Sequence, residues 1–204
     1  MTPFLVALLV LQTGTDSLAS RVRQLADSYM VAYFEQHPDE GTQNGVANIR
    51  HDRLPDNSAE SLARWQARED VWLATLKRVN PKRIAGRPEW IAYGIMRDAI
   101  EGSVATRVCR YELWSVAHTG GGWLSTVTSL AALQPVGSDD ARAQVLARWR
   151  AIPVYIATET ANHREGLRRS YTAPRGNVQI ALNELDTLLA MPVAQSPLYD
   201  PARR

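Results

Sequence analysis

The sequence of 204 residues is poor in the residue types that cross-link a chain or bind a transition metal. It has one cysteine, Cys109, and four histidines, no two of which lie within five residues of each other. A single cysteine excludes both an internal disulfide and a cysteine metal cluster. A zinc peptidase helix needs two histidines one turn apart, in the pattern H-E-x-x-H, and this pattern is absent. The sequence therefore carries no catalytic or metal motif of its own.

An excess of charge of either sign is also absent. Lysine and arginine together number 23 and aspartate and glutamate 21, so the net charge is +2. Such a balance does not supply the long-range positive field of a nucleic-acid-binding protein. Because 45% of the residues are hydrophobic, the chain is too apolar to be disordered. We predict a globular protein with no nucleic-acid partner.

Long hydrophobic runs are limited to FLVALLVL at residues 4–11. A bilayer span needs about 20 apolar residues, so we expect no stable membrane span. The run suits the core of a secretory signal peptide, and small residues at 17 and 19 would permit cleavage between Ala19 and Ser20. The first three residues lack lysine and arginine, which leaves a buried helix start as the alternative. We predict that residues 1–19 are a signal peptide and that the protein is exported to the periplasm or the medium.

Hydrophobic residues recur at spacings of 3 and 4 through most of the chain, and none alternates with period 2 for long enough to indicate a strand. We predict an all-α fold of six to seven amphipathic helices, with residues 20–190 as a helical domain and 191–204 as a proline-containing tail or truncated continuation. The expected helices are 17–37, 59–80, 88–116, 123–133, 139–152, 153–169 and 175–190. Ser58 is expected to cap the second, and Pro153 to separate the fifth from the sixth.

Several local features carry expectations of their own. The polar residues 37–57 are predicted to form a long surface connection in which histidine and aspartate side chains are solvated. Gly94 and Gly102 each cost a helix about 1 kcal/mol relative to alanine, so we expect a neighbouring element to pack closely against both. Trp65 and Trp72 share a helix face and are predicted to lie in the core.

Polar clusters that could support chemistry are few. Glu159 and His163 are four residues apart on one helix, and we interpret them as a solvent-facing pair in preference to metal ligands. The stretch from His118 to Gly122, with its Gly120–Gly122 turn, resembles the oxyanion loop of lipases, but the G-x-S-x-G elbow is absent. A flexible turn is the preferred interpretation. Cys109 is expected to fill a small apolar space.

Four segments, taken in order, resemble the N-terminal part of a bacterial family known as domain of unknown function 885. The segments are HDRLPDNS at 51–58, LARWRAIPVY at 146–155, REGL at 164–167 with YTAPR at 171–175, and SPLY at 196–199. The resemblance covers about residues 20–201.

The resemblance implies an exported, largely helical protein similar to zinc metallopeptidases. In such proteins the H-E-x-x-H helix and a third metal ligand belong to a C-terminal half, which this sequence does not contain. Zinc and a peptide substrate are therefore implied only for the full-length protein, where the missing half would be the intramolecular partner. We expect this segment to be inactive alone.

Three residues are candidates for the wall of a substrate cleft in the complete protein: Trp123, Tyr171 and Arg175. Arginine can hold a peptide carboxylate through two hydrogen bonds, and Arg175 follows a turn, where binding residues often lie. The alternative for Arg175 is that it only begins the last helix, and for Trp114, Trp123 and Trp149 that they lie in the core. The alternative function is a free-standing exported helical module that binds another molecule.

Overall fold

A computed structural model describes residues 4–116 and 122–204, and for residues 4–16 it describes the backbone alone. The chain is 77% helical. The described residues include no strand, so the prediction of an all-α fold is confirmed. The chain forms two compact units. The first consists of residues 1–33 and 63–109, and the second of residues 34–62 and 110–204.

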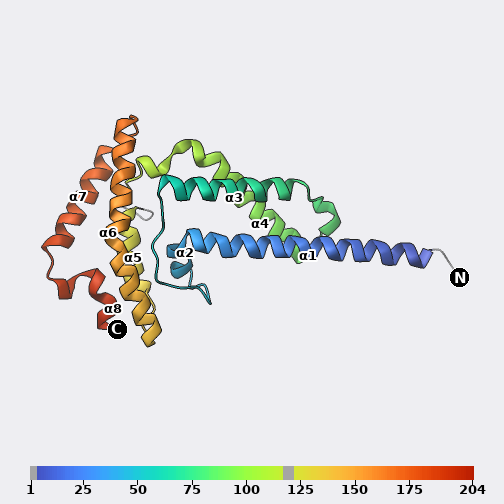
Figure 1. The fold of residues 1–204 in the computed structure, drawn as a ribbon, viewed down its shortest axis with the longest axis horizontal. Coiled ribbons are helices and arrows are strands. Elements are labelled where there is room, and N and C mark those ends of the chain that lie inside the picture. The colour runs from blue at the N-terminus through green and yellow to red at the C-terminus, as the bar shows by residue number, and fades with distance from the viewer. Residues whose placement is uncertain (1–3, 117–121) are drawn as a thin grey trace. The chain divides into compact units, whose positions relative to one another are not determined.

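The first unit is built from three long helices that lie side by side in Figure 1: α1 (Phe4–Gln36), α3 (Ala59–Lys77) and α4 (Pro88–Thr106). Ser58 caps the N-terminus of α3 as predicted, because its hydroxyl accepts a hydrogen bond from the N–H of Ser61 at 3.3 Å. The core of this unit consists of apolar side chains from all three helices, among them Val22, Tyr29, Trp65, Leu76, Met96 and Ile100.

Aromatic rings form the centre of this core. The ring centroids of Tyr29 and Trp72 are 5.3 Å apart in an edge-to-face arrangement, and those of Trp65 and Trp72 are 5.6 Å apart. Such pairs stabilise a fold by about 0.5–1.5 kcal/mol beyond the burial of their area. The prediction that Trp65 and Trp72 lie in the core is confirmed.

The end of α4 differs from the prediction. The helix stops at Thr106 and not near Val116, and the turns η2 (Arg107–Cys109) and η3 (Tyr111–Leu113) follow it. Arg110, between these turns, has a left-handed backbone with φ of 48°, which an α-helix does not accommodate. Arg107 ties the end of α4 to α3, because it donates hydrogen bonds to Glu69 at 2.9 Å and to Asp70 at 2.8 Å.

The expected close packing at the two helix glycines is wrong. A Cβ atom added at Gly94 or at Gly102 would meet nothing within 4 Å among the residues that the structure describes. Their cost to α4 is therefore not offset by the approach of a neighbouring element at these positions.

The first unit also contains the turn η1 (Pro81–Ile84), and the second unit contains the other elements. In chain order they are α2 (Pro38–Gln43), η3, α5 (Trp123–Leu133), α6 (Asp139–Arg168), α7 (Arg175–Ala190), η4 (Val193–Gln195), η5 (Pro197–Tyr199) and α8 (Asp200–Arg203). Helix α5 contacts α2, α6, η5 and α8. Its buried Val127 and Leu130, with Leu113, Val145 and Tyr155, supply the apolar core of this unit.

Helix α6 runs without a break through Pro153, so the prediction of two helices here is wrong. Proline removes only one hydrogen bond from the helix and bends it. Arg148 before Pro153 and Tyr155 after it are both buried, which shows that packing holds the helix on either side of the proline.

Gly166, near the end of α6, is required by a close approach. A Cβ atom at this position would lie 1.9 Å from the carbonyl oxygen of Leu113 in η3. Only glycine lets η3 pack this tightly against the helix.

The segment 191–204 is ordered by contacts with the rest of the second unit, and it forms three short helical turns. The indole N–H of Trp149 donates to the carbonyl of Leu198 at 2.9 Å. Arg204 donates to the carbonyls of Ala131 and Gln134 at 2.9 and 3.0 Å. Polar contacts to backbone groups therefore take the place of the amphipathic pattern that this segment lacks.

The predicted cleavage point lies within α1. Ala19 is buried in the core of the first unit, and Ser20 is exposed. Residues 1–3 and the side chains of 4–16, which include the predicted signal-peptide core, lie outside the described residues. In the part of the chain that the structure describes, no helix is long and apolar enough to cross a membrane.

Candidate functional site

The buried face of α6 carries polar side chains where a helix normally presents apolar ones. Gln144, Arg148, Tyr155 and Glu159 are all buried, and their spacings of 4, 7 and 4 residues place them on one face of a helix. Buried polar groups cost free energy unless they find hydrogen-bond partners. Residues 51–57, which have no regular secondary structure, provide many of these partners.

Arg148 is the centre of this arrangement, and its side chain is fully buried. Its guanidinium donates to the carbonyl of Arg53 at 2.9 Å, to Gln134 at 2.6 Å and to the hydroxyl of Thr42 at 2.9 Å. Burial lowers the pKa of Arg148 to about 10, while the charges of Asp39 and Asp52 raise it. The side chain therefore remains a cation near neutral pH and holds the irregular segment against α6.

The hydroxyl of Thr42 links Pro38, His51 and Arg148. The hydroxyl of Thr42 donates to the carbonyl of Pro38 at 3.1 Å and lies 2.9 Å from Nδ1 of His51. A hydroxyl has one proton to donate, and Arg148 can only donate. With the hydroxyl proton directed at Pro38, Nδ1 of His51 carries a proton and donates to Thr42.

The prediction that histidine and aspartate between 37 and 57 are simply solvated is wrong for His51, Asp39 and Asp52. Asp39 and Asp52 each have a buried Oδ1 with no hydrogen-bond partner among the described residues. Part of the predicted surface connection is in fact the helix α2, and its Pro38 and Thr42 are buried. The positive charge of Arg148 compensates these carboxylates, because opposite charges interact strongly where water is excluded.

Glu159 also differs from the prediction of a solvent-facing pair with His163, because only 8% of its surface is exposed. Its Oε1 accepts a hydrogen bond from the side-chain amide of Asn57 at 2.6 Å. The side-chain amide of Asn162 donates to the backbone carbonyl of Asn57 at 2.9 Å, which holds this asparagine in place. Burial raises the pKa of Glu159, whereas the bond from Asn57 and the charge of His163 lower it.

Trp123 and Glu159 line one pocket of about 240 Å³ between α5 and α6. Trp123 is the first residue of α5 and is half-buried. The other lining residues all come from one face of α6 and are Ile156, Thr160, His163, Arg164 and Leu167. The structure thus places a predicted cleft residue beside a buried carboxylate.

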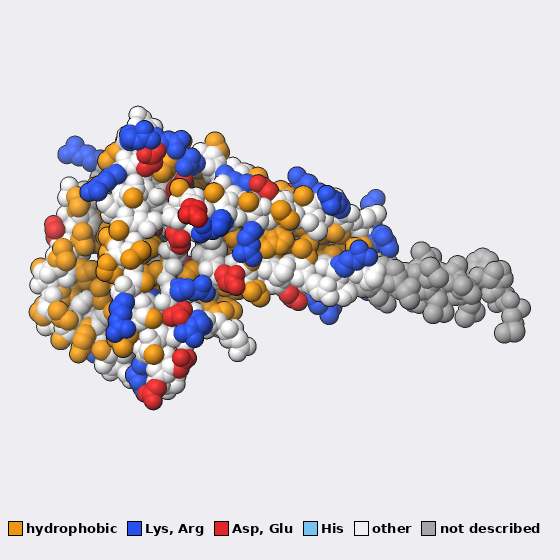
Figure 2. Space-filling view, viewed as in Figure 1, with side chains coloured by type: hydrophobic (Ala, Val, Ile, Leu, Met, Phe, Trp, Pro, Cys, Tyr) orange, Lys and Arg blue, Asp and Glu red, His pale blue; other side chains and the backbone are white. Residues whose placement is uncertain are grey.

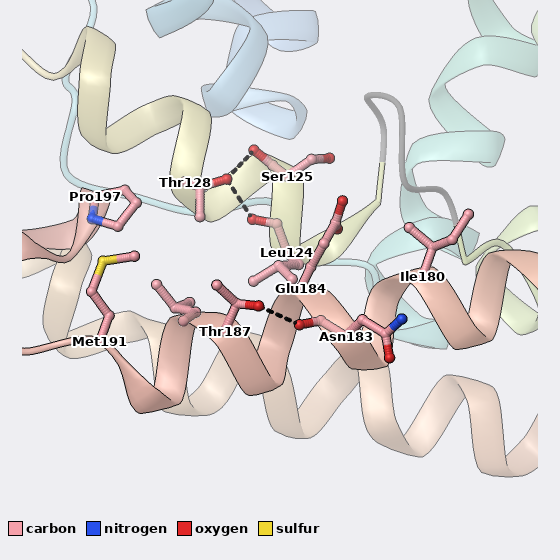
Figure 3. A pocket seen from close by; sticks show the side chains of 10 residues that line it. Leu124, Ser125, Thr128, Ile180, Asn183, Glu184, Thr187, Met191 and Pro197 are labelled. Carbon is pink, nitrogen blue, oxygen red and sulfur yellow. Dashed lines mark hydrogen bonds between the residues drawn. The ribbon is translucent and has the colours of Figure 1, made fainter.

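A second, larger pocket of about 510 Å³ is an open groove between α5 and α7. Figure 3 shows side chains of α5, α7 and Pro197 around it. The hydroxyls of Thr128 and Thr187 bond to carbonyls of their own helices, which leaves their methyl groups and the apolar chains to form the walls. The apolar lining residues are Leu124, Ile180, Leu188, Met191 and Pro197.

Helix α7 is amphipathic in sequence, but none of its residues is buried. Ile180 is 39% exposed and Leu189 is 74% exposed. Figure 2 shows hydrophobic side chains on the surface over the part of the chain that contains α6 to α8. An apolar helix face that stays in contact with water is typical of a surface that binds another polypeptide.

The three predicted cleft residues do not line one pocket. Tyr171 follows α6, where its N–H donates to the carbonyl of Gly166 at 2.9 Å and the guanidinium of Arg169 lies 5.9 Å from its ring centroid. Arg175 is the exposed first residue of α7. Neither lines the groove or the pocket of Trp123.

Sequence reasoning missed the buried side chains of Arg148 and Glu159. The signal was the recurrence of polar residues along α6 at helical spacing, which looks like a solvated face until the partner segment is known. The stretch from residue 117 to 121, which holds most of the predicted glycine-rich turn, lies outside the described residues.

Zinc does not fit the side chains of this chain that the structure describes. No group of three or more histidine, cysteine, aspartate or glutamate side chains is close enough there to hold a metal ion. We therefore derive no chemical step through zinc from these residues.

Comparison with known proteins identifies a family. Residues 38–204, which are most of the chain, match the family described as "Bacterial protein of unknown function (DUF885)". No curated protein and no solved structure matches the chain. The segment 146–155 contacts two of the other three segments that carry the resemblance, through Arg148 to Arg53 and through Trp149 to Leu198. Within the third segment, the N–H of Tyr171 donates to the carbonyl of Gly166.

Proposed function

Because the chain belongs to the bacterial family of unknown function DUF885, we propose that it is the polypeptide-binding helical portion of an exported, metallopeptidase-like protein. In this proposal the metal and the general base come from a part of the protein outside these 204 residues, and the groove between α5 and α7 receives the bound polypeptide.

The observation that carries the proposal is the groove itself. Its walls are apolar, and Asn183 and Glu184 on α7 add polar groups beside them. An extended polypeptide presents both apolar side chains and backbone donors and acceptors, so it can satisfy both kinds of lining. Ile180 is an apolar residue of α7 that is partly exposed and lines the groove, so it offers contact area without any rearrangement of the core.

Binding of an unfolded polypeptide tests the proposal. The full chain is titrated into fluorescein-labelled casein, and fluorescence anisotropy reports the binding. We expect Ile180→Asp to weaken binding by about tenfold, which corresponds to about 1.4 kcal/mol, because it places a charge in the apolar wall. Leu189→Asp is the matched control, since Leu189 is on the same helix and more exposed but does not line the groove. Equal effects of the two substitutions, or no binding by the unsubstituted chain, would contradict the proposal.

The catalytic context needs a test of the native product. An antibody raised against residues 20–190 would be used to purify the protein from the periplasmic and extracellular fractions. We expect the purified product to cleave casein, to lose this activity with a chelator and to regain it with zinc. Its absence from both fractions would contradict the proposed export.

A free-standing exported binding module is the second candidate, and the separate core of each unit favours it. It predicts a native product close to the size of residues 20–204 that binds casein at the groove and does not cleave it. The two candidates therefore share the groove experiment and differ in the activity of the native product.

A further inference from the structure

We propose that the pocket between α5 and α6 binds a protonated primary amine that carries a short apolar group. The pocket is separate from the groove between α5 and α7, and nothing in the proposed function depends on it. Its volume of about 240 Å³ suits a small group and not a whole peptide.

The main observation is the carboxylate of Glu159. The side chain is more than nine-tenths buried, and Asn57 bonds to Oε1. Glu159 also lines the pocket. A carboxylate that is largely removed from water costs free energy unless a positive charge pairs with it, so a ligand that donates hydrogen bonds and carries a positive charge would reduce that cost.

The neighbouring groups match an ammonium better than other donors. Thr160 and His163 line the same pocket on adjacent turns of α6, and a hydroxyl oxygen and an imidazole nitrogen can both accept hydrogen bonds. Together with Glu159 they offer three acceptors to the three N–H bonds of a compact ammonium. A guanidinium is larger and planar and spreads five donors over a fixed fork, which this one-sided set of acceptors does not satisfy.

The apolar walls select the rest of the ligand. Trp123 presents an indole, which attracts cations through its ring face, and Ile156 and Leu167 present aliphatic chains. Arg164 also lines the pocket, but its side chain is exposed and screened by water, whereas Glu159 acts from a buried position. The nearby carboxylate therefore dominates the interaction with a bound cation.

A peptide amino terminus and a free alkylamine share this chemistry, and three probes separate them. Leucine amide mimics an amino terminus, 3-methylbutylamine is a free amine, and N-acetyl-leucine amide lacks the ammonium. Isothermal titration calorimetry of the full chain is expected to show binding of at least one of the first two and none of the third. Binding of leucine amide alone would identify peptide termini as the ligand, and binding of 3-methylbutylamine alone would identify free amines.

Two variants with a matched control assign the site. Glu159→Gln keeps the size of the side chain and its bond from Asn57 but removes the charge, and we expect it to weaken amine binding by about tenfold or more. Trp123→Leu is expected to weaken binding by a smaller factor. Glu165→Gln removes a carboxylate from the same helix that pairs with Arg168 and should leave binding unchanged.

Binding that persists in Glu159→Gln, binding of the acetylated probe, or the absence of binding by both amines would overturn the proposal. These results are independent of casein binding at the groove, so the failure of one proposal is distinguishable from the failure of the other.

Discussion

At the scale of single residues, Gly166 is the position where one added carbon has the largest expected effect. Gly166→Ala would force η3 away from α6, because the new Cβ would overlap the carbonyl of Leu113. We expect a loss of about 1–3 kcal/mol or more in the free energy of unfolding, measured by urea denaturation. Gly176→Ala is the control in α7, where a Cβ meets nothing within 4 Å, and it should gain about 0.5–1 kcal/mol. A loss of similar size in both variants would contradict the close approach at Gly166.

The carboxyl group of Glu159 gives a second prediction at this scale, a dependence of stability on pH. Burial raises the pKa of Glu159 in the folded state above its usual value of 4.5, so the folded protein binds this proton more tightly than the unfolded chain. The free energy of unfolding therefore falls as pH rises from the unfolded pKa through the raised folded pKa. Tyr155, His163 and Asn57 face the same carboxylate.

Glu159→Gln lacks this titration, so its stability relative to the unsubstituted protein should increase with pH between pH 4 and 8. Denaturation curves at each pH measure the difference. Glu165→Gln should show a small effect of opposite sign, because a hydrogen bond from Arg168 lowers the pKa of Glu165. If the stabilities of the two variants changed with pH in parallel, burial would not be the main influence on the pKa of Glu159.

At the scale of elements, the contact between α6 and residues 51–57 depends on Arg148. Arg148→Met would remove this donor from the carbonyl of Arg53 and the side-chain oxygen of Gln134, and it would remove one of the hydrogen bonds to Thr42. We expect a loss of about 3–5 kcal/mol, together with faster proteolysis between residues 44 and 58. Arg150→Met is the control, since Arg150 is exposed on the same helix, and it should change stability by less than about 0.5 kcal/mol. Unchanged proteolysis in Arg148→Met would show that other contacts hold the segment.

Elements also show where local sequence signals succeed and fail. Helix α5 has the bounds that its sequence predicts, and Ser58 caps α3 as expected. Proline and glycine misled the prediction at Pro153, Gly94 and Gly102, because their effect depends on what packs around them. The helix continues through Pro153 where buried residues on both sides hold it.

At the scale of the whole molecule, each unit has its own core, and this gives a prediction about cooperativity. Leu76 in the first unit and Leu130 in the second are both fully buried. We expect Leu76→Ala and Leu130→Ala each to cost about 2–5 kcal/mol. Hydrogen exchange followed by mass spectrometry should accelerate mainly in the unit that carries the substitution, α3 and α4 for Leu76 and α5 and α6 for Leu130. Equal acceleration throughout would contradict separate cooperative units.

The sequence by itself determined the helical class and most helix starts, because helix periodicity and capping are local. It also determined the family, through four short segments. Only the tertiary structure decided that Arg148 and Glu159 are buried and that Trp123 shares a pocket with Glu159, while Tyr171 and Arg175 lie elsewhere. A polar residue at helical spacing looks the same in sequence whether its partner is water or a segment about 100 residues away, as Asn57 is from Glu159. Burial is a property of the partner as much as of the residue, so the fold was needed to reveal it.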